Sequence, residues 1–124
     1  MARRDLTGAV DFAYLESYAA NDQAIVEEVL GLFREQATMW ERLLDPATGA
    51  GTWRDAVHTL KGSARGIGAH ALAQACEQAE RGAASGSAWR EITAVRDSLD
   101  QALADIAAYL HEQALRSLKS GVRH

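Results

Sequence analysis

The sequence predicts an all-α protein, an antiparallel four-helix bundle with a short extra helix at its N-terminal end. Apolar residues recur every three or four positions along four long segments, which is the period of amphipathic helices. The chain has one proline and no alternating run of Val, Ile and Thr, so a sheet is not indicated. Glycines gather in short connectors such as 49–51 and 82–86, and short connectors favour antiparallel neighbours.

The N-terminal residues divide into a lead-in and a short helix. Residues 1–10 have little pattern, so we expect a flexible lead-in to a single domain that spans 11–118. Asp11 is suited to cap a helix that runs to Tyr18, followed by a bend. The residues of this helix expected to face inward are Phe12, Leu15 and Tyr18.

The second predicted helix covers residues 22–44. Asp22 is suited to cap its start, and Pro46 ends it because the residue before a proline avoids the helical region. Its expected core stripe consists of Val26, Leu30 or Val29, Phe33, Ala37, Trp40 and Leu44.

The third predicted helix follows a flexible connector at 47–51. Thr52 and Asp55 have the spacing of a capping box, and Gly66 or Gly68 suits the left-handed residue after a helix end. One face of this helix is apolar and comprises Trp53, Val57, Leu60, Ala64 and Ile67. A different, polar face comprises Arg54, His58, Lys61, Gly62 and Arg65.

Two further helices complete the predicted bundle. The fourth spans 69–79 and is expected to be buried through Leu72, Cys76 and Ala79, with a loop at 82–86. Ser87 is suited to cap the last helix, which extends to about Leu118 before a frayed tail at 119–124. Its expected stripe consists of Ile92, Val95, Leu99, Leu103 or Ala102, Ile106 and Leu110.

Composition argues against several classes of function. The net charge of −4 argues against a nucleic-acid surface. The sequence has no run of 18 apolar residues, so we expect no membrane association, and the single Cys76 fits a reducing compartment, so we expect a cytoplasmic protein. The remaining histidines, His70, His111 and His124, lack the partner spacing of a metal site. No nucleotide-binding glycine motif is present either, so we expect no cofactor.

The polar face of the third helix suggests a chemical role for His58. A glycine inside a helix costs about 0.5–1 kcal/mol relative to alanine, yet Gly62 lies one turn after this histidine. Such a glycine leaves room for a bulky group on the ring. A phosphoryl group is one candidate, because Lys61 and Arg65 can answer its negative charge.

The string HTLKGSARGIG, with Leu72, Cys76 and Glu80 downstream, resembles the histidine-containing phosphotransfer (HPt) domain family. The resemblance implies that His58 accepts a phosphoryl group from the aspartyl phosphate of one receiver domain and passes it to another. It also implies that Lys61 and Gly62 flank the phosphohistidine and that Glu80 reaches the other ring nitrogen. Without the family pattern, nothing favours Glu80 over Glu77.

The implied partners are the receiver domains of a hybrid histidine kinase and of a response regulator, with Mg²⁺ held by the receiver. The protein is then a phosphocarrier and not an enzyme with its own ATP-binding kinase domain. Three alternatives stay open. Arg65 is equally well explained as ordinary helix-surface charge. The bundle could instead be a docking module for receivers that is never phosphorylated, or a dimeric phosphotransferase, although we expect a monomer.

Overall fold

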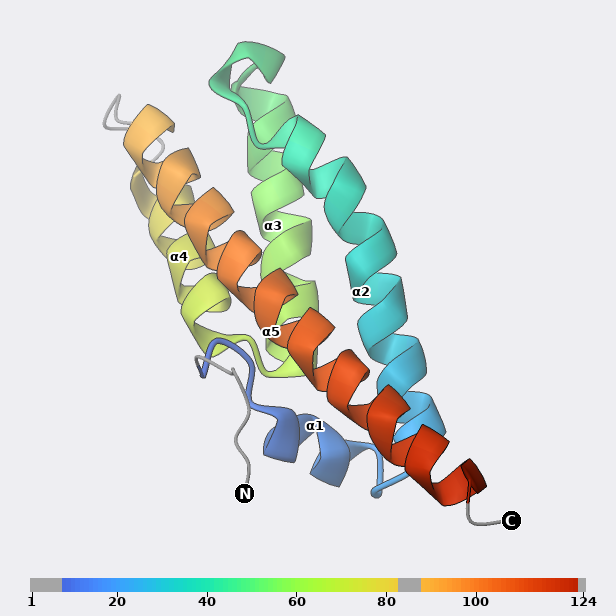
Figure 1. The fold of residues 1–124 in the computed structure, drawn as a ribbon. Helices are drawn as coiled ribbons and strands as arrows, with labels where there is room; N and C mark the ends of the chain where they lie inside the picture. The colour runs from blue at the N-terminus through green and yellow to red at the C-terminus, as the bar shows by residue number, and fades with distance from the viewer. Residues whose placement is uncertain (1–7, 83–87, 123–124) are drawn as a thin grey trace.

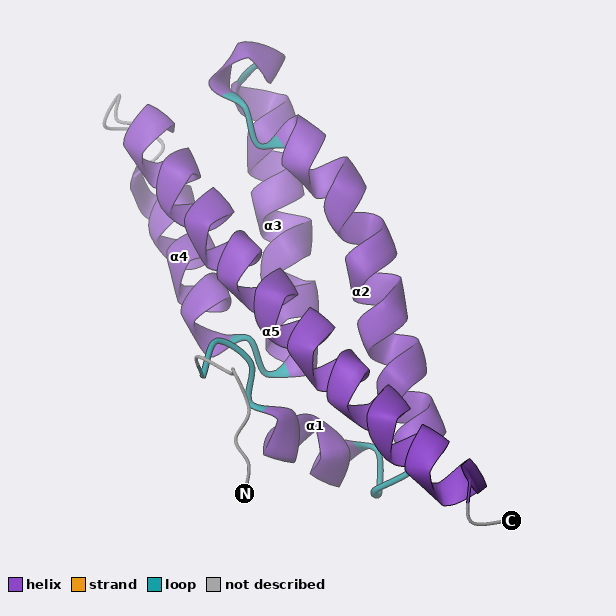
Figure 2. Ribbon diagram, in the orientation of Figure 1, coloured by secondary structure: helices purple, strands orange, loops and turns teal. Residues whose placement is uncertain are grey.

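A computed structural model describes residues 8–82 and 88–122 of the chain. In these ranges it contains five α-helices and one short 3-10 helix (Figures 1 and 2). The helices are α1 (Phe12–Tyr18), α2 (Gln23–Leu43), α3 (Ala50–Ile67), α4 (His70–Gly82) and α5 (Ala88–Val122), with the 3-10 helix η1 at Pro46–Thr48. Helices α2 to α5 form the bundle, and α1 lies across one end of it (Figure 1). The predicted fold class is confirmed.

The chain before α1 is anchored to the bundle. Val10 is buried, and the backbone N–H of Ala9 donates to the buried Asp105 carboxylate of α5 at 3.0 Å. The N–H of Asp11 donates to the carbonyl of Gly68 at 2.9 Å. The flexible lead-in predicted for 1–10 is therefore wrong for residues 8–10, and residues 1–7 lie outside the described part of the chain.

Helices α1 and α2 begin at the caps that the sequence predicts. The Asp11 side chain accepts from the N–H of Tyr14, and the Asp22 side chain accepts from the N–H groups of Ala24 and Ile25. The expected inward position of Tyr18 is wrong, because its side chain is exposed whereas Phe12 and Leu15 are buried. A seven-residue helix has room for only two turns of contact with the core.

The start of α3 differs from the prediction. The helix begins at Ala50 after Gly49, which makes no side-chain cap hydrogen bond, so the capping box at Thr52 and Asp55 is wrong. Asp45 instead caps η1 by accepting from the N–H of Ala47 at 2.8 Å. The flexible connector predicted for 47–51 is thus mostly helical, because η1 and the first turn of α3 occupy it.

Gly68 ends α3, as the sequence indicates. Its φ of +82° lies in the left-handed region, where a side chain is strained. A Cβ atom there would also lie 2.9 Å from the carbonyl oxygen of Asp11. The turn into α4 and the docking of the N-terminal segment both need a glycine at this position.

Helices α4 and α5 are longer than predicted. Helix α4 continues past 79 to Gly82, and α5 continues past Leu118 to Val122, so residues 119–122 of the predicted frayed tail are helical. The proposed Ser87 cap and residues 83–86 of the proposed loop lie outside the described residues. None of the helices in the described ranges combines the length and apolar composition that a membrane span requires.

The core is built from the stripes that the periodicity predicts, with one change on α5. Of the two residues left open there, Ala102 is buried and Leu103 is half-buried, and Tyr109 takes the buried position expected of Leu110. The ring of Tyr109 stacks on Phe12 at 4.3 Å, and its hydroxyl donates to Glu16 at 2.6 Å. This contact ties α1 to the bundle end.

Candidate functional site

The side chain of His58 lies on the solvent-facing side of α3 and is 75% exposed. Its neighbours in sequence, Val57 and Leu60, are fully buried and fix the rotation of the helix about its axis. The amphipathic pattern of α3 therefore holds the imidazole outside the bundle, where another molecule has access to it.

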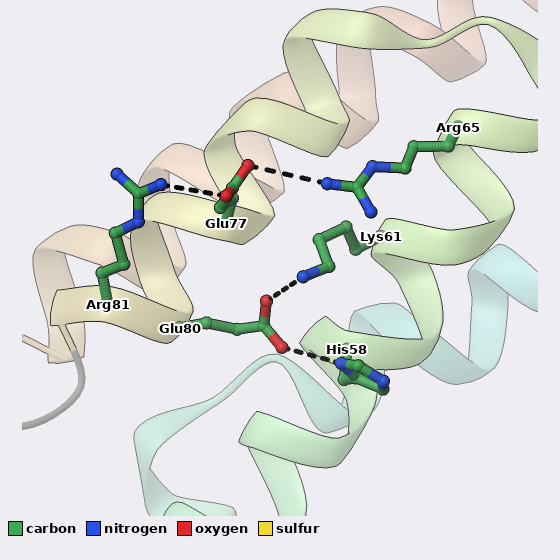
Figure 3. Close-up of polar contacts among 6 residues, drawn as sticks. All are labelled: His58, Lys61, Arg65, Glu77, Glu80 and Arg81. Atoms are coloured by element: carbon green, nitrogen blue, oxygen red, sulfur yellow. Dashed lines mark hydrogen bonds and ion pairs between the residues drawn. The ribbon is translucent and has the colours of Figure 1, made fainter.

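Glu80 of α4 contacts the inner nitrogen of this ring. Its Oε2 lies 2.9 Å from Nδ1 of His58 (Figure 3). The hydrogen bond from Lys61 holds the pKa of the Glu80 carboxyl below its usual 4.5, and it outweighs burial, which acts to raise this pKa. The hydrogen bond with His58 lowers the pKa further. An ionised carboxylate only accepts hydrogen bonds, so Nδ1 carries the proton. Nε2 of the neutral ring then presents a lone pair to solvent.

Lys61 binds the other oxygen of the same carboxylate. Its Nζ donates to Oε1 of Glu80 at 2.5 Å, and its side chain is only 16% exposed. The predicted cation is therefore next to His58, but it is engaged with Glu80 and partly covered. One carboxylate from α4 bridges two side chains that lie three residues apart on α3.

Gly62 leaves open space one turn after His58. A Cβ built at this position meets no heavy atom within 4 Å, and the residue has ordinary helical geometry. Neither packing nor backbone conformation requires a glycine here. The fold therefore does not require a glycine at position 62, whereas it does require one at position 68.

Arg65 points to a different carboxylate. Its guanidinium lies 3.6 Å from Glu77 of α4, which also accepts from Arg81 at 3.0 Å (Figure 3). Arg65 is thus directed across to α4 and is not brought against the ring of His58. Glu77, which the sequence could not separate from Glu80, pairs with these arginines, whereas Glu80 contacts the imidazole. Arg54 lies over the ring of Trp53 at 5.9 Å.

The sequence did not predict an apolar groove that lies between α2 and α3, the helix that carries His58. A groove of about 280 Å³ is lined by residues that include Leu32, Val29, Ser63 and Gly66. A second stripe of apolar side chains lies beside the core stripe of α2, with successive spacings of four, three, seven and four residues. In chain order its members are Ile25, Val29, Leu32, Met39 and Leu43, of which Val29 and Leu43 are half-buried and the other three are exposed. That spacing was the available signal.

The site holds other groups that bear on its chemistry. Cys76 is buried beneath it on α4, and burial together with the Glu80 charge raises the pKa of its thiol to about 12. Within residues 8–82 and 88–122, no group of three or more His, Cys, Asp or Glu side chains is placed to hold a metal ion. The arrangement offers an oriented, exposed imidazole as a nucleophile.

Two comparisons with known proteins found matches to this chain. The family model of the Hpt domain matches residues 23–109. The chain is also similar to the histidine phosphotransferase ShpA from Caulobacter crescentus, whose crystal structure matches with 57% sequence identity and a TM-score of 0.78. That match covers 90% of this chain and 99% of ShpA. No curated protein matches this chain.

Proposed function

This chain belongs to the Hpt domain family, and on that premise we propose that it is a histidine phosphotransfer protein of a multistep phosphorelay. His58 accepts a phosphoryl group from the aspartyl phosphate of one receiver domain and passes it to the aspartate of a second. The observation that carries the proposal is the geometry of the ring. The imidazole is 75% exposed and has a carboxylate 2.9 Å from its inner nitrogen.

The transfer step follows from the protonation state of the ring. The lone pair of Nε2 attacks phosphorus in line, the P–N bond forms, and the bond from phosphorus to the aspartyl oxygen breaks. The electron pair leaves with the aspartyl carboxylate. The ring gains positive charge while Nδ1 keeps its proton, and the Glu80 carboxylate stabilises that charge. Transfer to the second receiver reverses these steps.

The other side chains of the site have supporting roles in this proposal. Gly62 leaves the space in which the phosphoryl group and the receiver approach the ring. Lys61 and Arg65 add positive charge, and both do so from the side of α3 that faces α4. The receiver brings Mg²⁺, which neutralises charge on the transferring group. This chain therefore contributes an oriented nucleophile and access to it.

We place receiver docking on a surface defined by Ile25, Val29, Leu32 and Met39 of α2 with Gly66 of α3. Ile25, Leu32 and Met39 are exposed apolar side chains, and the grooves between α2 and α3 run beside the helix that carries His58. Exposed apolar residues next to a reactive group favour a small transient interface, as exchange between two receivers requires. We propose that the protein binds its receivers in the cytoplasm and as a monomer. Light scattering on the purified chain will test the oligomeric state.

A labelling experiment tests the function. Incubation with receiver domains carrying labelled aspartyl phosphate is expected to give acid-labile label on the wild type and none on His58→Gln. His70→Gln is a matched control because the side chain of His70 is also exposed, at 66%, and should keep the label. Label that survives His58→Gln would overturn the assignment. Stable receiver binding without any label would favour the non-phosphorylated docking module instead.

A further inference from the structure

A pocket of about 300 Å³, the corner pocket, lies between α1 and the start of α2. Helix α1 crosses the end of the bundle at which α2 begins (Figure 1). One wall of the pocket comes from α1 and the turn after it, through Leu15, Tyr18, Ala19 and Ala20. None of the described residues that line the pocket is charged. The corner pocket therefore suits an apolar group and offers no partner to a charged one.

The opposite wall of the corner pocket belongs to the docking surface. Ile25, Val29 and Gly66 line the pocket, and all three are part of that surface. Val29 and Gly66 also line the groove of about 280 Å³ between α2 and α3. A receiver that occupies the docking surface therefore reaches the mouth of the corner pocket.

Tyr18 lies at the rim of the corner pocket. It is the last residue of α1 and is 78% exposed, more than any other large apolar residue in the described part of the chain. A tyrosine ring offers a large apolar face with a polar end, and tyrosines are among the residues that contribute most to binding when a partner covers them. The position of Tyr18 thus places a strong contact residue beside an apolar pocket.

The turn that forms part of the pocket wall has an unusual backbone. Ala20 and Asn21 have φ values of +56° and +62°, in the left-handed region that alanine rarely adopts because its Cβ approaches a carbonyl oxygen. Hydrogen bonds hold the turn, since the N–H of Ala20 donates to Ser17 at 3.0 Å and that of Asn21 donates to Glu16 at 2.7 Å. Strained conformations of this kind cluster at functional sites. The wall is therefore fixed before a partner binds, which lowers the entropic cost of binding.

We propose that the corner pocket receives one apolar side chain of the docked receiver, that Tyr18 packs against this side chain, and that the contact selects among receivers. This inference rests on the proposed function and adds a partner contact to it. Gly66 lies eight residues after His58, about 12 Å along the helix, so the contact changes receiver affinity and takes no part in the chemistry. The family match begins at residue 23 and does not account for α1.

The first experiment measures the binding of a panel of unphosphorylated receiver domains by NMR titration of the ¹⁵N-labelled protein. We expect bound receivers to shift the signals of Ala19 and Ala20 together with those of the docking surface. Tyr18→Ser should raise Kd by about five- to thirtyfold, the scale of one covered aromatic contact. Trp89→Ser is the matched control, because this aromatic residue is also exposed, at 69%, but lies on α5, and it should change Kd by less than about twofold.

A second variant separates a pocket from a flat apolar patch. Ala19 has a φ of −86°, which a larger residue also adopts, so Ala19→Met should fill the corner pocket without straining the backbone. Because the receiver side chain then has no place to enter, Kd should rise by about three- to tenfold although the apolar surface has grown. Tighter binding by Ala19→Met would show that no side chain enters the corner, and would overturn the proposal.

Phosphorylation by phosphoramidate, a small donor that needs no docking, keeps this inference apart from the function on which it rests. Its rate in Tyr18→Ser should match the wild type, and thermal unfolding of each variant checks the fold. If a receiver labels His58 but binds Tyr18→Ser and Trp89→Ser equally well, the corner contact is overturned and phosphotransfer stands. If a receiver binds without labelling His58, the same Kd values still decide the corner contact. If no receiver in the panel binds, both proposals are overturned.

Discussion

Gly62 allows a test in which stability and transfer change in opposite directions. The residue is inside α3, and a Cβ atom there would meet no heavy atom within 4 Å. Gly62→Ala should therefore raise the free energy of unfolding by about 0.5–1 kcal/mol, the usual helix cost of glycine. For a chain of this size the gain corresponds to about 2–5 °C in Tm.

A longer side chain at the same position should slow transfer. Helical side chains lean toward the preceding turn, so Gly62→Gln covers the ring of His58, which lies one turn earlier. We expect receiver-to-His58 transfer to slow by about ten- to a hundredfold, the range found when a reacting geometry is displaced by an ångström or so. Thermal unfolding should show that this variant is still more stable than the wild type.

Gly31 is the matched control for both effects. It is inside α2, a Cβ atom there also meets nothing within 4 Å, and it does not belong to the docking surface defined above. Gly31→Ala and Gly31→Gln should give a similar gain in Tm with unchanged transfer. Wild-type transfer by Gly62→Gln, or a loss of stability in Gly62→Ala, would refute the argument that this glycine serves access to the ring.

Three further predictions concern groups around the site and the bundle end. Because Lys61 lowers the pKa of Glu80, the ionised carboxylate stabilises the fold above pH 4.5, and this contribution is lost as the pH falls through the lower folded value. Urea unfolding should show a stability difference between wild type and Glu80→Gln that is largest above pH 4.5 and shrinks below it; a difference that grows in acid would contradict the sign. With a pKa of about 12, Cys76 has about one thiolate in ten thousand at pH 8, so a thiol reagent should react only after unfolding, and rapid reaction of the native protein would contradict its burial. Arg96 of α5 donates to the carbonyls of Glu41 and Leu44 at 2.8 and 3.0 Å, which caps the end of α2. Arg96→Met should lower the free energy of unfolding by about 1–2 kcal/mol in chemical denaturation, with Arg96→Lys intermediate, and an unchanged midpoint would mean that the cap contributes nothing.

Local sequence determined most of the secondary structure and the exposure of His58. The stripes of α2, α3 and α4 were predicted because the core side of a helix repeats every 3.6 residues, which the order of the residues alone displays. Asp11 and Asp22 marked helix starts because a cap contacts N–H groups within three residues. The same reasoning failed at Thr52, where η1 allows α3 to begin earlier.

Contacts between helices could not be read in this way. The burial of Tyr109 in place of Leu110 could not be predicted from local sequence, because its stacking partner Phe12 is 97 residues earlier in the chain. Choosing Glu80 over Glu77 needed the family resemblance, since both lie on α4 and only the packing angle decides which one meets the imidazole. The direction of Arg65 toward Glu77 has the same cause.

The sequence by itself therefore determined that the chain is helical, where most of its helices begin, and that an exposed histidine stands beside a lysine and a glycine on one helix. Only the tertiary structure decided that Lys61 is bound to Glu80 on the Nδ1 side of the ring and that an apolar groove runs alongside. Helix periodicity sets the face on which a side chain lies. What that side chain meets depends on the position and rotation of a second helix, which are set by the packing of the whole core.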